Sequence, residues 1–433
     1  MDKIWEEAAE LQEELVARRR DLHQYPETGW TEFRTASMVI QTLRHLGYQV
    51  AFGPEVLAEE AMLGVPDADT LAAAAARAID EGADAALVEA MKGGKTGIVA
   101  TISGNGPGRT VAFRFDMDCN DVAETAASQH LPNRLNFASR HPNAMHACGH
   151  DGHVAIGLGL AKLLAGHQQE LVGQVKLIFQ PAEEGVRGAY AMVQQGVVDD
   201  VDYFFGGHIG FKARENASLV CTTEGFLATT KLDALYTGVA SHAGLAPEEG
   251  RNALLAAAQA CLALHGIPRH GKGSSRINVG VLHGGTGRNV VPDRACLKLE
   301  TRGATTEINN YMVQQAQRIL EASAAMYEVQ LRLDKVGSAP GCQGDVALGQ
   351  EITNLAAASA AYEQLVPTMD MGGSEDCAYF MERVQQLGGR ALYMMYGSEL
   401  AAGHHQSNFD FDEDTLWRTV GLLTKLALKY VHN

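Results

Sequence analysis

The chain has 433 residues, and its 35 Lys and Arg against 52 Asp and Glu give a formal net charge of −17. Hydrophobic residues make up 46% and charged residues 20%, which excludes wholesale disorder, and the length predicts two or three domains. An acidic surface repels phosphate groups, so nucleic acids and anionic membranes are excluded as favoured partners.

The sequence carries no targeting or membrane signal. The first residues are acidic, whereas a signal peptide begins with a basic segment followed by an apolar one. No apolar run reaches the roughly 18 residues that a membrane span needs. Seven cysteines are scattered along the chain and do not form a disulfide framework. We therefore expect a cytoplasmic, reduced protein.

The first half of the chain predicts helices and then alternating strands and helices. Amphipathic helices are expected up to about residue 24 and over 31–46, and the Ala-rich residues 54–94 predict a helical insertion. The expected strands are 96–102, 110–115, 175–180 and 202–205, and the helices between them are 154–164 and 189–195. Such alternation predicts a mostly parallel sheet with helices on both faces.

The middle of the chain changes its pattern to strand, helix, strand, strand, helix, strand, the order of a ferredoxin-like sandwich. The ranges are 227–239, 252–264, 276–282, 295–301, 306–326 and 328–336. An α/β pattern then resumes with helix 347–362, strand 391–396 and helix 413–430. We predict one α/β domain in two parts, residues 1–224 and 339–433, interrupted by an inserted α+β domain, residues 225–338.

Two polar clusters follow predicted strands of the first part, which is where sites of open α/β sheets lie. Asp116 and Asp118 can support a metal directly or by holding another ligand. Cys148 and His150 offer a thiolate and an imidazole, donors that suit zinc and its neighbours. A buried structural cysteine and a Cys–His nucleophilic pair are the alternatives.

Later residues extend these clusters. Of the adjacent acids Glu183 and Glu184, one can bind a metal while the other acts as a general base, the alternative being a solvated acidic loop. His208 and the pair His404-His405 each follow a predicted strand. A single histidine such as His208 is more often structural, but with these histidines the donors of all clusters suffice for two ions that share a bridging water.

The inserted domain holds two further polar sites. His242 follows a long strand, and Asn289 lies in a Gly-rich turn between two strands. Both would suit stabilisation of an oxyanion or binding of a substrate carboxylate, against the alternative of a turn with polar tips. The turn lacks the Gly-Lys-Ser/Thr ending of a phosphate-binding loop.

Taken together, the motifs resemble the aminoacylase-like co-catalytic metallopeptidases, in the branch of amino-acid amidohydrolases, hippurate hydrolases and auxin-conjugate hydrolases. They run in order along nearly the whole chain: His23-Gln-Tyr-Pro-Glu27, Asp116-Met-Asp118, His146-Ala-Cys-Gly-His-Asp151, Pro181-Ala-Glu-Glu-Gly185, Ser241-His242, Asn289-Val-Val-Pro292, Gly373-Ser-Glu-Asp376 and His404-His405. The resemblance implies a catalytic domain with two divalent ions per subunit, zinc or manganese, and an inserted dimerisation, or lid, domain.

The resemblance also implies roles for individual residues. The metal ligands would be Cys148, His150, Glu184, His208 and His405. His405 is preferred to His404 because it stands four residues before Phe409, as the family's ligand does. Glu183 would be the general base. His242 of the lid would reach the active site of the partner protomer, and Asn289 and Arg302 would contact the substrate.

The sequence departs from this branch at a few positions. Cys119-Asn120-Asp121 stands where Ala-Leu-Pro is usual, and Cys377 where Phe is common. The insertion and the late His-His motif most resemble the subgroup that splits p-aminobenzoyl-glutamate into p-aminobenzoate and glutamate, in which two similar but distinct subunits pair.

The sequence therefore predicts a metal-dependent amidohydrolase for an N-aroyl or N-acyl amino acid, working as a homodimer or as a heterodimer with a homologous subunit. Three alternatives remain: a broader N-acyl-amino-acid amidohydrolase or dipeptidase, a catalytically silent partner within a hydrolase complex, and a hydrolase with Cys148 as nucleophile.

Overall fold

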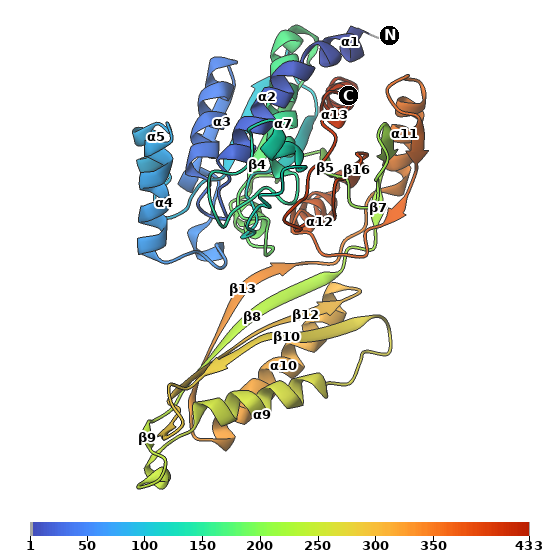
Figure 1. Cartoon of the computed structure of the whole chain (residues 1–433). Coiled ribbons are helices and arrows are strands. Elements are labelled where there is room, and N and C mark those ends of the chain that lie inside the picture. Colours follow the sequence, from blue (N-terminus) through green and yellow to red (C-terminus); the bar gives the residue numbers. More distant parts are fainter. Residues whose placement is uncertain (1–2, 433) are drawn as a thin grey trace. The chain divides into compact units, whose positions relative to one another are not determined.

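The computed structural model describes residues 3–432 and divides them into two compact units (Figure 1). The first unit comprises the described residues up to Glu224, Gln343–Met371 and the described residues from Tyr379 onward. The second comprises Gly225–Cys342 and Gly372–Ala378. Within the described residues, no helix combines the length and apolar character that a membrane crossing requires.

An eight-stranded sheet organises the first unit. Its order is β1 (Gln49–Phe52), β2 (Ile98–Ser103), β4 (Gln174–Gln180), β3 (Thr110–Asp116), β5 (Tyr203–Ile209), β16 (Arg390–Tyr396), β6 (Ser218–Val220) and β14 (Gln364–Val366). The four central strands, β4, β3, β5 and β16, are parallel to one another, and antiparallel pairs occur only toward the edges. The prediction of a mostly parallel central sheet is confirmed.

Helices flank this sheet, and the central one is α7 (His150–Gly166). Its residues are apolar on nearly every side and almost all buried, as expected of a helix enclosed by other elements. A methyl group at Gly157 would come within 2.8 Å of Phe115 and Phe179, so glycine is needed for the close approach to the sheet. Outside residues 54–94, the other helices of the unit are α1 (Lys3–Glu10), α2 (Gln12–Gln24), α3 (Phe33–His45), α6 (Leu131–Arg134), α8 (Ala189–Gln194), α11 (Val346–Ala357), α12 (Ala378–Gln386) and α13 (Thr415–Tyr430).

Residues 54–94 hold the short helices α4 (Ala68–Asp80) and α5 (Ala85–Ala90), besides two 3₁₀ turns. Each helix begins at an aspartate whose side chain accepts backbone N–H bonds: Asp67 from Thr70 at 2.8 Å, and Asp84 from Ala86 and Leu87 at 2.8 and 3.1 Å. Such caps satisfy N–H groups that have no partner inside the helix.

The second unit has the strand and helix order expected of a ferredoxin-like sandwich. Its antiparallel sheet runs β10 (Ser275–Gly284), β12 (Arg294–Gly303), β8 (Ala228–Thr237) and β13 (Gln330–Ala339). The helices α9 (Ala253–His265) and α10 (Thr306–Met326) pack on this sheet, and their buried residues share one hydrophobic core with it. β9 (Ser241–His242) and β11 (Val290–Val291) form a small antiparallel hairpin, which carries His242 and follows the turn that holds Asn289.

One expected boundary is wrong in a way that matters for the site. The strand expected over 202–205 continues to Ile209 as β5, so His208 lies within the strand rather than beyond its end. Gly206 and Gly207 suggested that the strand ends before His208, but Gly207 is needed for close packing inside the sheet. A methyl group there would lie 2.3 Å from the Tyr396 hydroxyl on the neighbouring strand β16.

Candidate metal and active site

The acidic loop after β4 is held in place by Asp118. The two carboxylate oxygens of Asp118 accept the backbone N–H groups of Glu183 and Glu184 at 3.0 and 2.9 Å. Ala182 and Val186, on either side of these acids, have left-handed φ angles of 50° and 58°. Left-handed conformations are strained for residues other than glycine and persist where the surroundings fix them. Asp118 therefore positions the adjacent carboxylates.

His150, at the start of α7, presents one ring nitrogen without a hydrogen-bond partner. Its Nδ1 donates to the Asp118 carbonyl at 2.8 Å, while its buried Nε2 makes no hydrogen bond within residues 3–432. Burial alone would lower the pKa of His150, but the nearby carboxylates of Asp116 and Asp118 raise it to about 10. A buried ring nitrogen that lies among carboxylates and has no hydrogen-bond partner is an arrangement that a metal cation would complete by replacing the proton.

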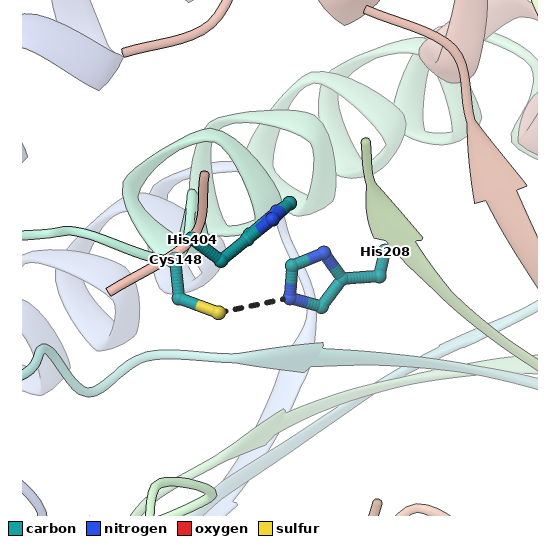
Figure 2. A group of neighbouring side chains, drawn as sticks. All are labelled: Cys148, His208 and His404. Carbon is teal, nitrogen blue, oxygen red and sulfur yellow. Dashed lines mark hydrogen bonds between the residues drawn. The ribbon is translucent and has the colours of Figure 1, made fainter. Parts of the chain in front are cut away.

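Cys148 and His208 lie next to each other, although they are 60 residues apart in sequence (Figure 2). The Cys148 Sγ is 3.4 Å from His208 Nε2, and His208 Nδ1 donates to the carbonyl of Ile209 at 2.7 Å. Burial, together with Glu184 and Glu183, raises the pKa of the Cys148 thiol well above its ordinary value. A free nucleophilic cysteine needs a lowered pKa, so this environment disfavours the Cys-nucleophile alternative.

The late histidine His405 joins this cluster from the other end of the chain. Its backbone N–H donates to the Ala147 carbonyl at 2.7 Å, and its Nε2 lies 3.2 Å from Glu184 Oε1. Burial would raise the pKa of Glu184, but His405 and His150 lower it to about 2. The Glu184 carboxylate is therefore ionised and can act as a ligand.

These contacts bring all five expected ligands, together with Glu183, into one cluster. Donor atoms lie within 4.8 Å of one another in the groups Cys148/Glu184/His405, His150/Glu183/Glu184, His150/His153/His208 and Cys148/His208/His404. Thiolate, imidazole and carboxylate donors are those that zinc and neighbouring divalent metals take. The donor set, together with the His150 Nε2 that has no hydrogen-bond partner within the described residues, fits a divalent metal centre.

Two supports of the site were not identified from the sequence. His153 donates from Nδ1 to Asp116, and its Nε2 accepts the Ile209 N–H at 2.9 Å. Its spacing of three from His150, which places both on one face of a helix, was the available signal. The other support is the fully buried Arg19 of α2, which contacts Asp151 at 2.8 Å and Asp410 at 2.6 Å. No sequence pattern distinguishes this arginine.

The expected lid residues all lie in the second unit, but only two are neighbours. His242 pairs with Val290 in the β9–β11 hairpin, and the adjacent Ala243 N–H donates to the Asn289 carbonyl at 3.0 Å. Arg302 lies near the far end of β12, where its guanidinium donates to Glu300 at 3.0 and 3.4 Å. Within this unit, the structure brings His242 and Asn289 together and leaves Arg302 apart.

Comparisons with known proteins identify the family of the chain. The model of peptidase family M20/M25/M40 matches residues 112–429. The chain is 50% identical to the indole-3-acetyl-aspartic acid hydrolase of Enterobacter agglomerans, covering 97% of each chain. It is 49% identical to the A-type subunit of the p-aminobenzoyl-glutamate hydrolase of Escherichia coli, covering 95% of this chain and 94% of that protein.

A solved structure extends the match to three dimensions. The aminobenzoyl-glutamate utilization protein of Klebsiella pneumoniae superposes with a TM-score of 0.85 at 42% identity, covering 99% of this chain and 98% of that one. The resemblance inferred from the ordered motifs is therefore confirmed. The chain belongs to peptidase family M20/M25/M40, and within it the chain is an amidohydrolase.

Proposed function

We propose that the chain hydrolyses the amide bond of an N-aroyl or N-acyl amino acid with an acidic side chain, p-aminobenzoyl-glutamate being the first candidate. The observation that carries this proposal is the group of His150, Glu183 and Glu184, whose donor atoms lie within 4.8 Å of one another. It places a carboxylate that can accept a proton beside a carboxylate and an imidazole that can bind a metal.

In this proposal Cys148, His150, Glu184, His208 and His405 hold two divalent ions, zinc or manganese. Bound ions of this kind polarise a carbonyl and make water a stronger nucleophile. Glu183 takes the proton of the attacking water and later gives it to the leaving amine. Asp118 serves both steps because it fixes the backbone of Glu183 and Glu184.

The substrate class rests on the relatives. One relative is a hydrolase of an aspartate conjugate and another of a glutamate conjugate, and both conjugates join an aromatic acyl group to an acidic amino acid. We propose that His242 stabilises the oxyanion and that Asn289 and Arg302 bind the substrate. Arg302 would have to exchange Glu300 for the substrate carboxylate. The net charge of −17 opposes an anionic substrate, so such local cations are needed.

Assembly and location complete the proposal. We propose that two protomers pair through the lid domain, residues 225–338, and that His242 serves the partner's site. The Escherichia coli relative is named as one subunit of a hydrolase, which supports a partner that is either a second copy or a homologous chain. All seven cysteines are free of disulfides, which supports the reducing cytoplasm.

The first experiment measures release of p-aminobenzoate by the metal-loaded protein, alone and with the homologous partner chain. Glu183→Gln should lower kcat by about 10²- to 10⁴-fold and leave the metal content unchanged, because it removes only the proton acceptor. Glu184→Gln should lower the metal content itself. Comparing indole-3-acetyl-aspartate with acyl-leucine and acyl-phenylalanine tests the preference for acidic amino acids. No hydrolysis of any acyl-amino acid under these conditions would refute the proposal.

A complementation experiment tests the role of the lid. Glu183→Gln and His242→Ala are each inactive as pure proteins if both residues are needed. If His242 acts on the partner's site, a mixed dimer has one complete site, and a 1:1 mixture should recover roughly a quarter of the wild-type activity. No recovery, with mixed dimers shown to form, means that His242 acts on its own site, whereas full activity of pure His242→Ala means that it acts on neither. Full activity of Glu183→Gln in a complex with the homologous partner chain would favour the alternative of a catalytically silent partner.

A further inference from the structure

The two adjacent histidines of the late motif face different donors. His405 has a left-handed φ of 64°, and its Nε2 approaches Glu184. His404 instead packs its ring on Phe211 at 4.5 Å and lies 5.3 Å from the His208 ring between centroids. The pair therefore reaches two sides of the cluster, although the sequence offered them as alternatives for one position.

The hydrogen bonds of His404 fix which ring nitrogen is free. His404 Nε2 lies 3.2 Å from the carbonyl oxygen of Ile209, and His208 Nδ1 lies 2.7 Å from the same oxygen. A carbonyl oxygen only accepts, so both nitrogens carry the proton. Lone pairs then remain on Nδ1 of His404 and on Nε2 of His208.

This arrangement is the one that ligating histidines show. Such a residue donates its second N–H to a carbonyl or carboxylate, which fixes the tautomer and the ring orientation. His404 and His208 meet this condition at one shared carbonyl, that of Ile209. One ring nitrogen of each lies within 4.8 Å of Cys148 Sγ, and Figure 2 shows the three side chains together. One sulfur and two imidazole nitrogens match the donors of a catalytic zinc site, which keeps a further position open.

We propose that His404 is itself a metal ligand and that Cys148, His208 and His404 hold one ion, while His405 and Glu184 belong to the other. This adds a sixth ligand to the five proposed above and rests on the proposed metal-dependent function. It also assigns the two ions different donors: the first lies among sulfur and nitrogen, and the second has carboxylate oxygen.

The competing explanation is that His404 only supports His208 through Ile209 and the ring contacts. Glutamine separates the two roles because its Nε2 occupies the place of the histidine Nε2 and can still donate to Ile209, while the nitrogen ligand is lost. A supporting role is therefore retained in His404→Gln and lost in His404→Ala. A ligand role is lost in both variants.

The test is titration of the metal-free full-length protein with cobalt(II), followed by the thiolate-to-cobalt absorption band, which reports the ion bound to Cys148. His404→Gln and His404→Ala are compared with wild type and with His45→Gln, an exposed histidine at the end of α3. Loss of a residue that only hydrogen-bonds a metal ligand, without binding the metal itself, weakens metal binding about 10- to 100-fold. We expect the cobalt affinity measured at this band to fall more than about 100-fold in both His404 variants, and that of His45→Gln to match wild type.

The outcomes separate this inference from the proposed function. Cobalt affinity of His404→Gln within about threefold of wild type would overturn the ligand role while leaving the metal-dependent hydrolase intact. Absence of a thiolate band in the wild type would overturn both. Far-ultraviolet circular dichroism of the metal-free variants verifies the fold, and restoration of the band by added imidazole in His404→Gly supports a direct ligand if His404→Gln misfolds.

Discussion

Arg19 offers a quantitative test of the charges that surround the candidate site. Its guanidinium is fully buried and lies 2.8 Å from Asp151, 2.6 Å from Asp410 and 3.1 Å from Glu413. Asp151 follows His150, and Asp410 lies five residues after His405, so one cation joins the two segments that carry these histidines. Methionine has a similar length and no charge, and it leaves the carboxylates without their partner.

The magnitude follows from burial. Removing one partner of a buried ion pair costs about 3–5 kcal/mol, because the remaining charge is left uncompensated. The neighbouring Arg20 provides a matched control, since it also contacts Glu413, at 2.6 Å, but its side chain is 31% exposed. Partly exposed pairs contribute about 0–1 kcal/mol. We expect Arg19→Met to lower the free energy of unfolding by about 3–5 kcal/mol and Arg20→Met by at most about 1 kcal/mol.

The assay is urea unfolding followed by tryptophan fluorescence. The three tryptophans, Trp5, Trp30 and Trp417, all belong to the first unit, so the signal reports the unit that contains Arg19. With a slope of about 3 kcal/mol per molar urea, the midpoint should fall by about 1 M or more for Arg19→Met. Equal and small shifts for the two variants would refute the view that Arg19 compensates buried charge.

Three further predictions concern the loop, the pH dependence and the second unit. Asp118→Asn weakens the support of Glu183 and Glu184, so metal affinity measured by calorimetry should fall about 10- to 100-fold, and an unchanged affinity would contradict the positioning role. Burial opposes protonation of His23, but Asp151 and Glu124 raise its pKa to about 9, above the unfolded value of about 6.5. The stabilisation from His23 is therefore present below about pH 6.5 and lost as the pH rises through 9, and His23→Gln should flatten this fall of the urea midpoint. Leu320→Ala removes a fully buried side chain of α10 and should cost about 2–5 kcal/mol, seen by circular dichroism but not in the tryptophan transition.

The sequence by itself determined the fold class and the types of donors. Alternation of strands and helices predicts a parallel sheet because a parallel connection needs a crossover, and the β-α-β-β-α-β order predicts the second unit. The ordered motifs named the cysteine, the histidines and the acids of the cluster. These features are local or follow chain order, so one sequence is enough to read them.

Only the tertiary structure decided which groups each of these side chains contacts. Asp116 and Asp118 turn out to hold His153 and the acidic loop, because their oxygens face groups from distant segments. His404 and His405 diverge because of a left-handed backbone angle, which no spacing rule encodes. The partner of a buried charge such as Arg19 is set by packing between α2, α7 and the end of the chain, and contacts of that range are visible only once the chain is folded.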